Sequence, residues 1–229
     1  MLPVSYPCLN LLICSCCLMT DKKLYGIYAI LPADLETDDL LNRAGAALEG
    51  GVRILQFRDK KKGYKRALQR AQALRQLTLK HGATFIVNDS IQLAMDSSAD
   101  GVHLGRDDEE MTTATLRDIG DKMLVGITCR ADASLAKSVL DNGVDYVAFG
   151  AIWKTESKPE VPEIGLNRLA KARQMFPAAN ICAIGGISAD NIAAVKAAGA
   201  DCAALISGLF AAQDIKAEAR KLVEAWNLA

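Results

Sequence analysis

Eight short apolar runs recur from Tyr25 onward, and each is followed by a longer stretch that mixes polar and apolar residues. The runs span residues 25–31, 53–58, 84–88, 101–105, 124–128, 146–152, 181–185 and 202–207. Their spacing, mostly about 20 to 30 residues, is typical of a strand followed by a helix rather than of a hairpin. Strands connected in this way are parallel. The repeat therefore restricts the chain to a (β/α)8 barrel or an open, doubly wound sheet.

The stretches between the runs have the period of amphipathic helices. Apolar stripes at this period are formed by Ala67, Ala71, Leu74 and Leu77, and by Ile215, Ala219, Leu222, Val223 and Trp226. Asp190 or Ser188 could cap the helix that carries Ile192 and Val195. The count of eight strands favours a barrel, and no glycine-rich dinucleotide motif follows the first strand. We predict an α/β fold, a single-domain (β/α)8 TIM barrel over residues 21–229.

Residues 1–20, MLPVSYPCLNLLICSCCLMT, differ in composition from the rest of the chain. Their apolar run, 9–19, is too short to span a bilayer and has no basic segment before it. Four of the seven cysteines lie here without a nearby histidine, which makes a metal site improbable. We expect a Cys-rich tail that is disordered, or an over-long start with Met19 as the true initiator. Cysteines in this odd, scattered arrangement do not predict disulfides, so we expect a cytoplasmic protein.

Charge excludes one class of partner. The chain has 27 Lys and Arg and 27 Asp and Glu, so its formal net charge is zero. A nucleic-acid-binding protein usually has a basic excess. We expect no nucleic-acid or membrane partner, and small-molecule substrates bound at a local site.

Polar residues and glycines gather where the predicted strands end, which is the functional face of a barrel. They are Gln56, Arg58, Lys60, Asn88, Asp89, Arg106, Asp107, Asp108, Thr155, Ser157, Lys158, Gly185, Gly186, Ser207 and Gly208. Singly, each has a structural explanation; Asp89, for example, could cap a helix that starts at Ser90. Together they predict a shared site.

The second strand shows how the faces divide. Positions 56, 58 and 60 share one face, which we expect to point into the barrel mouth. Positions 55, 57 and 59 share the other, with Leu55 and Phe57 against the helices and Asp59 at the rim.

These residue types suit two phosphorylated ligands. Arg58, Lys60 and Lys158 can neutralise a polyanion, and Asp89 with Asp108 can hold Mg²⁺, which completes its shell with phosphate oxygens. Together they form the usual clamp for a pyrophosphate leaving group. The glycine-containing ends of strands seven and eight, AIGGI and ISG, predict a second phosphate site.

Six motifs resemble those of the thiamin phosphate synthase (thiamine-phosphate pyrophosphorylase) family. They are QFRDK (56–60), VND (87–89), DGVHLGRDD (100–108), YVAFGAIWKTESKP (146–159), AIGGI (183–187) and ISGLF (206–210), in order along nearly the whole chain from Tyr25. The resemblance implies a transferase that joins hydroxymethylpyrimidine pyrophosphate to hydroxyethylthiazole phosphate, giving thiamin phosphate and pyrophosphate. It also implies a dissociative reaction, in which pyrophosphate leaves before the thiazole nitrogen traps the pyrimidine cation.

The resemblance further implies residue roles. Mg²⁺ is expected on Asp89 and Asp108. The pyrophosphate and pyrimidine are expected among Gln56, Arg58, Lys60, Asn88 and Lys158. The thiazole phosphate is expected at Gly186, Ile206 and Ser207, with Thr155 and Ser157 nearby.

Two positions depart from the family pattern. Arg106 follows HLG where the family usually has Gln, and the fifth-strand motif reads GITCR where Gly-Val-Ser-x-His is common. Thr128 keeps a hydroxyl, so we expect it to keep a contact with the leaving group or the pyrimidine. Arg130 stands in place of His, and either a solvent-facing side chain or an added anion contact is compatible with the sequence.

Two other functions remain compatible with a barrel of this kind. A related thiazole tautomerase would need a proton-transfer residue, for which the missing fifth-strand histidine is the natural candidate. His103 lies within GVHLG, where a packed or hydrogen-bonded strand histidine is the ordinary interpretation. A silent barrel that only binds thiamin precursors is the other, and a homo-oligomer is possible in each case.

Overall fold

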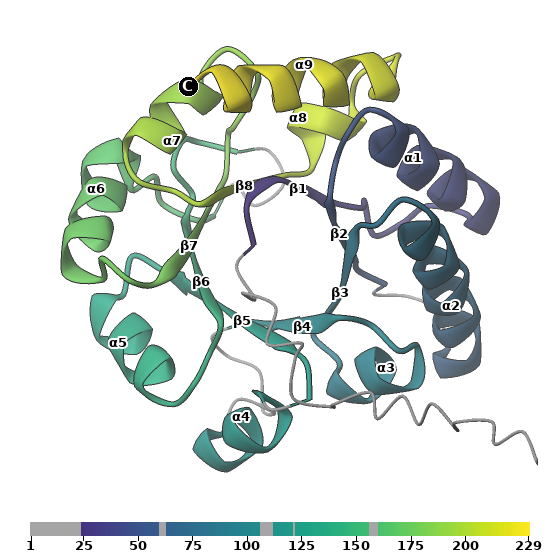
Figure 1. The fold of residues 1–229 in the computed structure, drawn as a ribbon, viewed down its shortest axis with the longest axis horizontal. Helices are drawn as coiled ribbons and strands as arrows, with labels where there is room; N and C mark the ends of the chain where they lie inside the picture. The colour runs from purple at the N-terminus through teal and green to yellow at the C-terminus, as the bar shows by residue number, and fades with distance from the viewer. Residues whose placement is uncertain (1–23, 60–62, 106–111, 121, 156–159) are drawn as a thin grey trace, which may run out of the picture.

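The computed structural model describes residues 24–59, 63–105, 112–120, 122–155 and 160–229. Eight parallel strands close into a barrel in the order β1 to β8, as Figure 1 shows. The strands are β1 (Gly26–Ile30), β2 (Ile54–Phe57), β3 (Thr84–Asn88), β4 (Gly101–Leu104), β5 (Leu124–Arg130), β6 (Tyr146–Gly150), β7 (Asn180–Ile184) and β8 (Cys202–Leu205). The predicted TIM barrel is confirmed.

Helices surround the barrel in a ring (Figure 1). They are α1 (Thr37–Glu49), α2 (Tyr64–Lys80), α3 (Ile91–Asp96), α4 (Thr113–Gly120), α5 (Ala133–Asp141), α6 (Gly165–Met175), α7 (Ile192–Ala197), α8 (Ser207–Phe210) and α9 (Ile215–Leu228). The short α8 was not predicted, and its first residue, Ser207, was assigned to the end of the last strand. Within the described ranges, no helix has both the length and the apolar character required to cross a bilayer.

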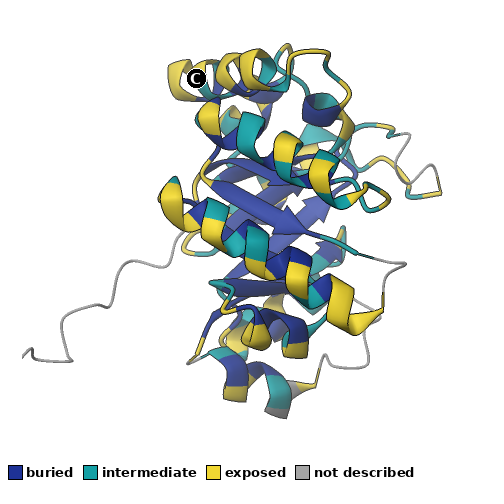
Figure 2. Cartoon of the chain, turned by 90° about the vertical axis from the view of Figure 1, so that its right-hand side faces the viewer, coloured by how far each residue is buried: buried dark blue, intermediate teal, exposed yellow. Residues whose placement is uncertain are grey.

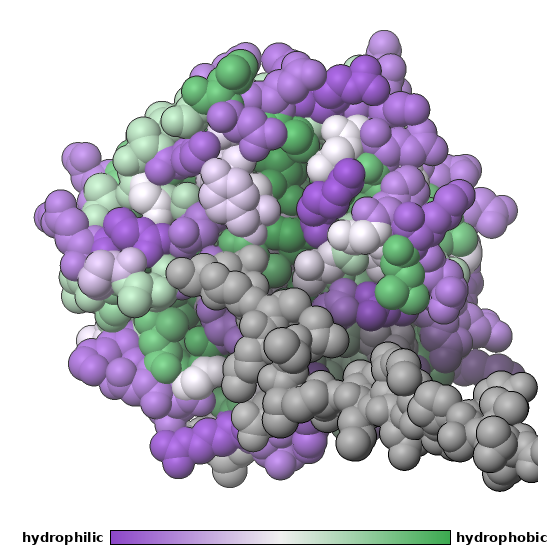
Figure 3. Space-filling view, in the orientation of Figure 1, coloured by the Kyte–Doolittle hydropathy of each residue, from purple (hydrophilic) through white to green (hydrophobic). Residues whose placement is uncertain are grey.

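Alternation along each strand separates two cores. Ile27 and Ala29 of β1 belong to the larger core, between the barrel and its helices, whereas Tyr28 and Ile30 belong to the smaller core inside the barrel. Figure 2 shows this arrangement as a buried barrel with helices exposed only on their outer sides, and hydrophilic residues dominate the periphery in Figure 3. Both predicted helix stripes pack into the larger core.

The amino ends of three strands are fastened by aspartates. Three aspartates directly precede β4, β6 and β8: Asp100, Asp145 and Asp201. Each carboxylate accepts a hydrogen bond, at 2.7–2.8 Å, from a backbone N–H of the preceding strand, which is β3, β5 or β7. Arg75 and Arg173 pair with the first and last of these carboxylates. These charges support the barrel at the end opposite to the predicted site.

Two helix caps differ in part from expectation. Ser90, not Asp89, caps α3, since its side chain accepts a hydrogen bond from the Leu93 N–H. Asn191 occupies the N-cap of α7, and its side chain makes no capping bond there. Instead its amide holds the preceding loop, donating to the Gly186 carbonyl and accepting from the Ser188 N–H, both at 2.9 Å. The expectation that Asp190 or Ser188 caps this helix was wrong, because the cap residue serves the loop.

The predicted position of Asp59 at the rim was also wrong. It does not lie at an open rim; its carboxylate contacts the Arg70 guanidinium at 2.5 Å, and the two side chains are 1% and 2% exposed. Arg70 also donates to the Leu35 carbonyl at 2.8 Å and lies 5.5 Å from the Phe57 ring centroid. Asp59 follows Phe57 on the outward face, as alternation predicts, but α2 covers that face.

Candidate active site

A cavity of about 330 Å³ opens at the carboxyl ends of the strands. Its wall comes from the residues that follow β1, β2, β6, β7 and β8, together with the last part of β5. This is the end of a barrel at which function is expected. The repeat that determines the fold therefore also determines where the cavity forms.

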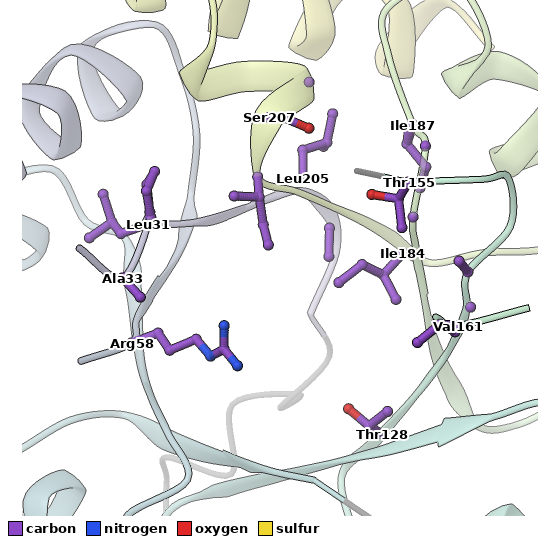
Figure 4. A pocket seen from close by; sticks show the side chains of 18 of the residues that line it. Leu31, Ala33, Arg58, Thr128, Thr155, Val161, Ile184, Ile187, Leu205 and Ser207 are labelled. Carbon is purple, nitrogen blue, oxygen red and sulfur yellow. The ribbon is translucent and has the colours of Figure 1, made fainter. Parts of the chain in front are cut away.

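The cavity brings together eight of the predicted site residues from distant parts of the chain. They are Arg58, Thr128, Thr155, Gly185, Gly186, Ile206, Ser207 and Gly208. In Figure 4 the Arg58 side chain reaches toward the middle of the cavity from one side, and Thr155 lies on the opposite side. Cationic and hydroxyl-bearing groups thus face each other across one space.

The remaining predicted residues lie elsewhere or are not described. Gln56 is 2% exposed and donates a hydrogen bond to Tyr28 inside the barrel, so it lies beneath the cavity rather than in its wall. Asn88 and Asp89 lie at the end of β3, outside the wall. Lys60, Arg106, Asp107, Asp108, Ser157 and Lys158 fall outside the described residues.

Asp89 has an unusual backbone. Its φ is +65°, in the left-handed region that few residues other than glycine adopt. Its N–H donates to the His103 carbonyl at 2.9 Å, and its side chain is exposed. A strained conformation of this kind often occurs at a functional site. Among the described residues no group of three or more His, Cys, Asp or Glu side chains that could hold a metal ion occurs.

Gly186 allows the backbone to come close to the cavity. Its φ is +66°, and an added Cβ would lie 2.7 Å from the Trp153 Cβ and 2.9 Å from the Lys154 carbonyl oxygen. No other residue fits this position without displacing the loop after β6. The glycine therefore keeps the β6 and β7 loops in contact beside the cavity.

Arg130 lines the cavity, which favours the anion-contact alternative for this residue. The register between β5 and β6 shifts between Thr128 and Arg130, and Arg130 has a φ of +55°. Arg130 nevertheless shares the face of Thr128, because the two residues are two positions apart on the strand. Thr128 and Arg130, the two residues at which the fifth-strand motif departs from the family pattern, thus face the same cavity.

Several wall residues were missed by the sequence analysis. The loop after β1 contributes Leu31, Pro32, Ala33 and Asp34, and Val161 comes from the segment before α6. The signal that could have identified Asp34 is its place four residues after β1, at the functional end. Apolar residues, among them Ile184, Ile187 and Leu205, complete the wall.

Thr128 is connected to the barrel interior through His103. The His103 Nε2 lies 2.8 Å from the Thr128 Oγ1, and its Nδ1 lies 3.0 Å from the Tyr146 hydroxyl. The histidine is 9% exposed. The prediction of a hydrogen-bonded strand histidine is confirmed.

Comparisons with known proteins agree with the motifs. The family model described as thiamine monophosphate synthase matches residues 27–209. The chain is 47% identical to the thiamine-phosphate synthase of Thioalkalivibrio sulfidiphilus over 205 residues, which cover 89% of this chain and 96% of that protein. It is 44% identical to that of Chromobacterium violaceum over 200 residues, 87% of this chain and 95% of that protein.

A solved structure shows the same likeness. The thiamine phosphate pyrophosphorylase of Pyrococcus furiosus superposes with a TM-score of 0.80 and 28% sequence identity, over 89% of this chain and 96% of that one. The predicted family is confirmed by sequence and by fold. The chain belongs to the thiamine-phosphate synthase family.

Proposed function

We propose that the cavity is the active site in which this member of the thiamine-phosphate synthase family joins hydroxymethylpyrimidine pyrophosphate to hydroxyethylthiazole phosphate. One observation supports the proposal above the others. A single cavity has Arg58 on one side and Ser207 on another (Figure 4), and Gly186 and Ile206 also line it. It thus offers two separate places for anionic groups, as a reaction between two phosphorylated substrates requires.

The pyrophosphate substrate is assigned to the side of Arg58 and Thr128. A guanidinium donates charge-assisted hydrogen bonds to phosphate oxygens, and a hydroxyl adds another. Lys60 and Lys158, with Gln56 and Asn88 for the pyrimidine, complete this assignment on the strength of the family motifs. Arg130 adds a second described cation to the cavity wall.

The thiazole phosphate is assigned to the loops after β7 and β8. Gly186, Ile206 and Ser207 line this side, and the hydroxyl of Thr155 lies on the same cavity wall. Glycine allows backbone N–H groups to approach a phosphate closely. Ser157 is assigned here from the motif alone. Apolar neighbours such as Ile184 and Ile187 suit the thiazole ring.

Mg²⁺ is assigned to Asp89 and Asp108. Carboxylate oxygens are the ligands that Mg²⁺ prefers, with substrate phosphates completing its shell. The exposed Asp89 carboxylate fits that role. When bound, the ion would neutralise charge on the pyrophosphate oxygens.

The wall residues suit a dissociative displacement. The bond between the pyrimidine methylene carbon and the pyrophosphate oxygen breaks, and the bonding electrons leave with pyrophosphate. The thiazole nitrogen then donates its lone pair to the methylene carbon. No proton has to be removed from that nitrogen, so the reaction needs charge stabilisation rather than a base. Arg58, Arg130 and Thr128 supply cationic and donor groups for this purpose.

The test is a direct assay of the purified chain with both substrates and Mg²⁺. We expect thiamin phosphate and pyrophosphate in equal amounts. Arg58→Ala should lower the rate strongly, whereas Arg66→Ala should not, because Arg66 is an exposed residue of α2 paired with Glu36. Binding of both substrates without any product would instead identify a silent barrel, and equal rates for the two variants would remove Arg58 from the site.

A further inference from the structure

Five polar side chains form a continuous series of hydrogen bonds through the barrel interior. Gln56 Nε2 donates to the Tyr28 hydroxyl at 2.8 Å, and this hydroxyl lies 3.0 Å from that of Tyr146. Tyr146 is 3.0 Å from Nδ1 of His103, whose Nε2 is 2.8 Å from Thr128 Oγ1. We call these residues the interior series. It crosses from β2 through β1, β6 and β4 to β5, and ends at the cavity wall.

The barrel sequence makes room for this series. Tyr28 and Tyr146 are 1% and 0% exposed, with their rings edge to face at 6.2 Å. At Gly126 of β5 an added Cβ would lie 1.9 Å from the Cζ of Tyr146 and 2.4 Å from its hydroxyl oxygen. A side chain at position 126 would therefore displace the phenol at the centre of the series.

Both phenols remain protonated and can therefore donate. Burial is the main cause that raises the pKa of Tyr28 and of Tyr146 well above the ordinary tyrosine value. Each phenol has one proton to give. Each phenol can also accept a hydrogen bond, so the order in which the protons point depends on which donors and acceptors the series offers.

One order gives both phenol protons and the imidazole proton an acceptor within the series. In this order Gln56 donates to the Tyr28 oxygen and Tyr28 donates to Tyr146, whereas the reverse order would leave the Tyr28 proton without an acceptor in the series. The Tyr146 proton then points to Nδ1 of His103, so the imidazole carries its proton on Nε2 and donates to Thr128. The Thr128 oxygen accepts this bond, which leaves its own proton to turn toward the cavity.

We propose that the interior series is a positioning device, in which Tyr28, Tyr146 and His103 fix Thr128 as a hydrogen-bond donor to an anionic oxygen in the cavity. A donor that is already oriented stabilises developing charge without reorganisation. For the proposed reaction that oxygen belongs to the departing pyrophosphate, and this assignment alone rests on the proposed function. Tyr28, Tyr146 and His103 act through Thr128, so they are positioning residues.

The first test reads the tautomer of His103 and does not depend on any activity. The chain has two histidines, so a His81→Gln variant assigns the imidazole signals in a heteronuclear NMR spectrum of the nitrogen-labelled protein. We expect the proton of His103 on Nε2. Tyr146→Phe should shift the Nδ1 signal more than the Nε2 signal, because the Tyr146 hydroxyl contacts Nδ1. A His103 with its proton on Nδ1 would overturn the proposal, because Thr128 would then donate inward.

The second test is a double-mutant cycle on turnover. Tyr146→Phe removes only the hydroxyl and should lower kcat about tenfold with little change in KM, the effect of one well-oriented hydrogen bond. In a Thr128→Ala background the same change should have less than about a twofold effect on kcat, because the hydroxyl through which Tyr146 acts is absent. Ile86→Val serves as the control, since this residue lies in the same interior core outside the series and should leave kcat unchanged.

The outcomes of the second test distinguish a failure of the positioning proposal from a failure of the proposed function. An equal loss from Tyr146→Phe in both backgrounds would show that the phenol acts through general stability and would overturn the proposal. A lower thermal midpoint with unchanged kcat would do the same. A wild-type chain without turnover would contradict the proposed function, and the tautomer of His103 would still decide the positioning of Thr128.

Discussion

The buried ion pair between Asp59 and Arg70 can be tested against its neighbour Arg58, which faces the cavity. The Asp59 and Arg70 side chains are 1% and 2% exposed and their charged groups are 2.5 Å apart. Asp59→Ala would leave a buried guanidinium that keeps its hydrogen bond to the Leu35 carbonyl but loses its counter-charge. Substitutions at these two adjacent residues should therefore have different effects. Asp59→Ala should lower the stability of the protein, and Arg58→Ala should lower its activity.

The magnitude follows from the burial. Removal of one partner from a buried ion pair typically costs about 3–5 kcal/mol, because the other charge stays buried without compensation. For a chain of this size each kcal/mol lowers the thermal midpoint by about 2–4 °C, so the expected decrease is about 6–20 °C. Replacement of both residues, Asp59→Leu with Arg70→Met, should recover much of this loss, since a buried pair is often no better than apolar residues of similar volume.

The assay is urea unfolding of the two single variants and the double variant, with kcat/KM measured where each is fully folded. We expect Asp59→Ala to lose stability and to keep more activity than Arg58→Ala. An Asp59→Ala protein with the wild-type free energy of unfolding would refute the reasoning. So would a double variant whose loss equals the sum of the two single losses.

Four further outcomes are expected. Arg58→Ala should lower kcat/KM for the pyrimidine pyrophosphate about 10- to 100-fold, the value of one charge-assisted contact, with steady-state kinetics as the check. EDTA should abolish synthesis, and Asp89→Ala should cut turnover by orders of magnitude without unfolding the chain; full activity in EDTA would remove the metal assignment. Gly186→Ala should raise KM for the thiazole phosphate and lower the thermal midpoint, because its Cβ would meet the β6 loop. A chain that starts at Met19 should match the full chain in activity and thermal midpoint, and loss of folding would show that residues 1–18 are structural.

The repeating pattern of the sequence was sufficient to predict the barrel. Each strand is an apolar run, and stripes at the helical period mark α2 and α9, so local signals agree with the global fold. The position of the cavity also follows from that pattern, because the carboxyl ends of parallel strands meet at one face. Arg58, Thr155 and Ser207 could be brought together on this ground alone, although they are far apart in the chain, whereas Thr128 was identified through the family resemblance.

Residue partnerships between distant elements could not be predicted in the same way. Asp59 finds Arg70 because α2 packs over the outer face of β2, and no local pattern indicates which arginine faces which strand end. Arg130 shares the face of Thr128, as alternation predicts, but the register shift in β5 and the positive φ of Arg130 could not be predicted from the sequence. The interior series depends on the fit of Tyr146 over Gly126, which is a matter of side-chain packing across the barrel.

The most direct measurement of the central claim is a crystal structure of the chain with thiamin phosphate, pyrophosphate and Mg²⁺ bound. We expect both products in the cavity, with pyrophosphate within hydrogen-bond distance of Arg58 and Thr128. The phosphate of thiamin phosphate should contact the backbone at Gly186 and Ser207. Products bound on another surface, with the cavity unchanged and none of these residues in contact, would contradict the account.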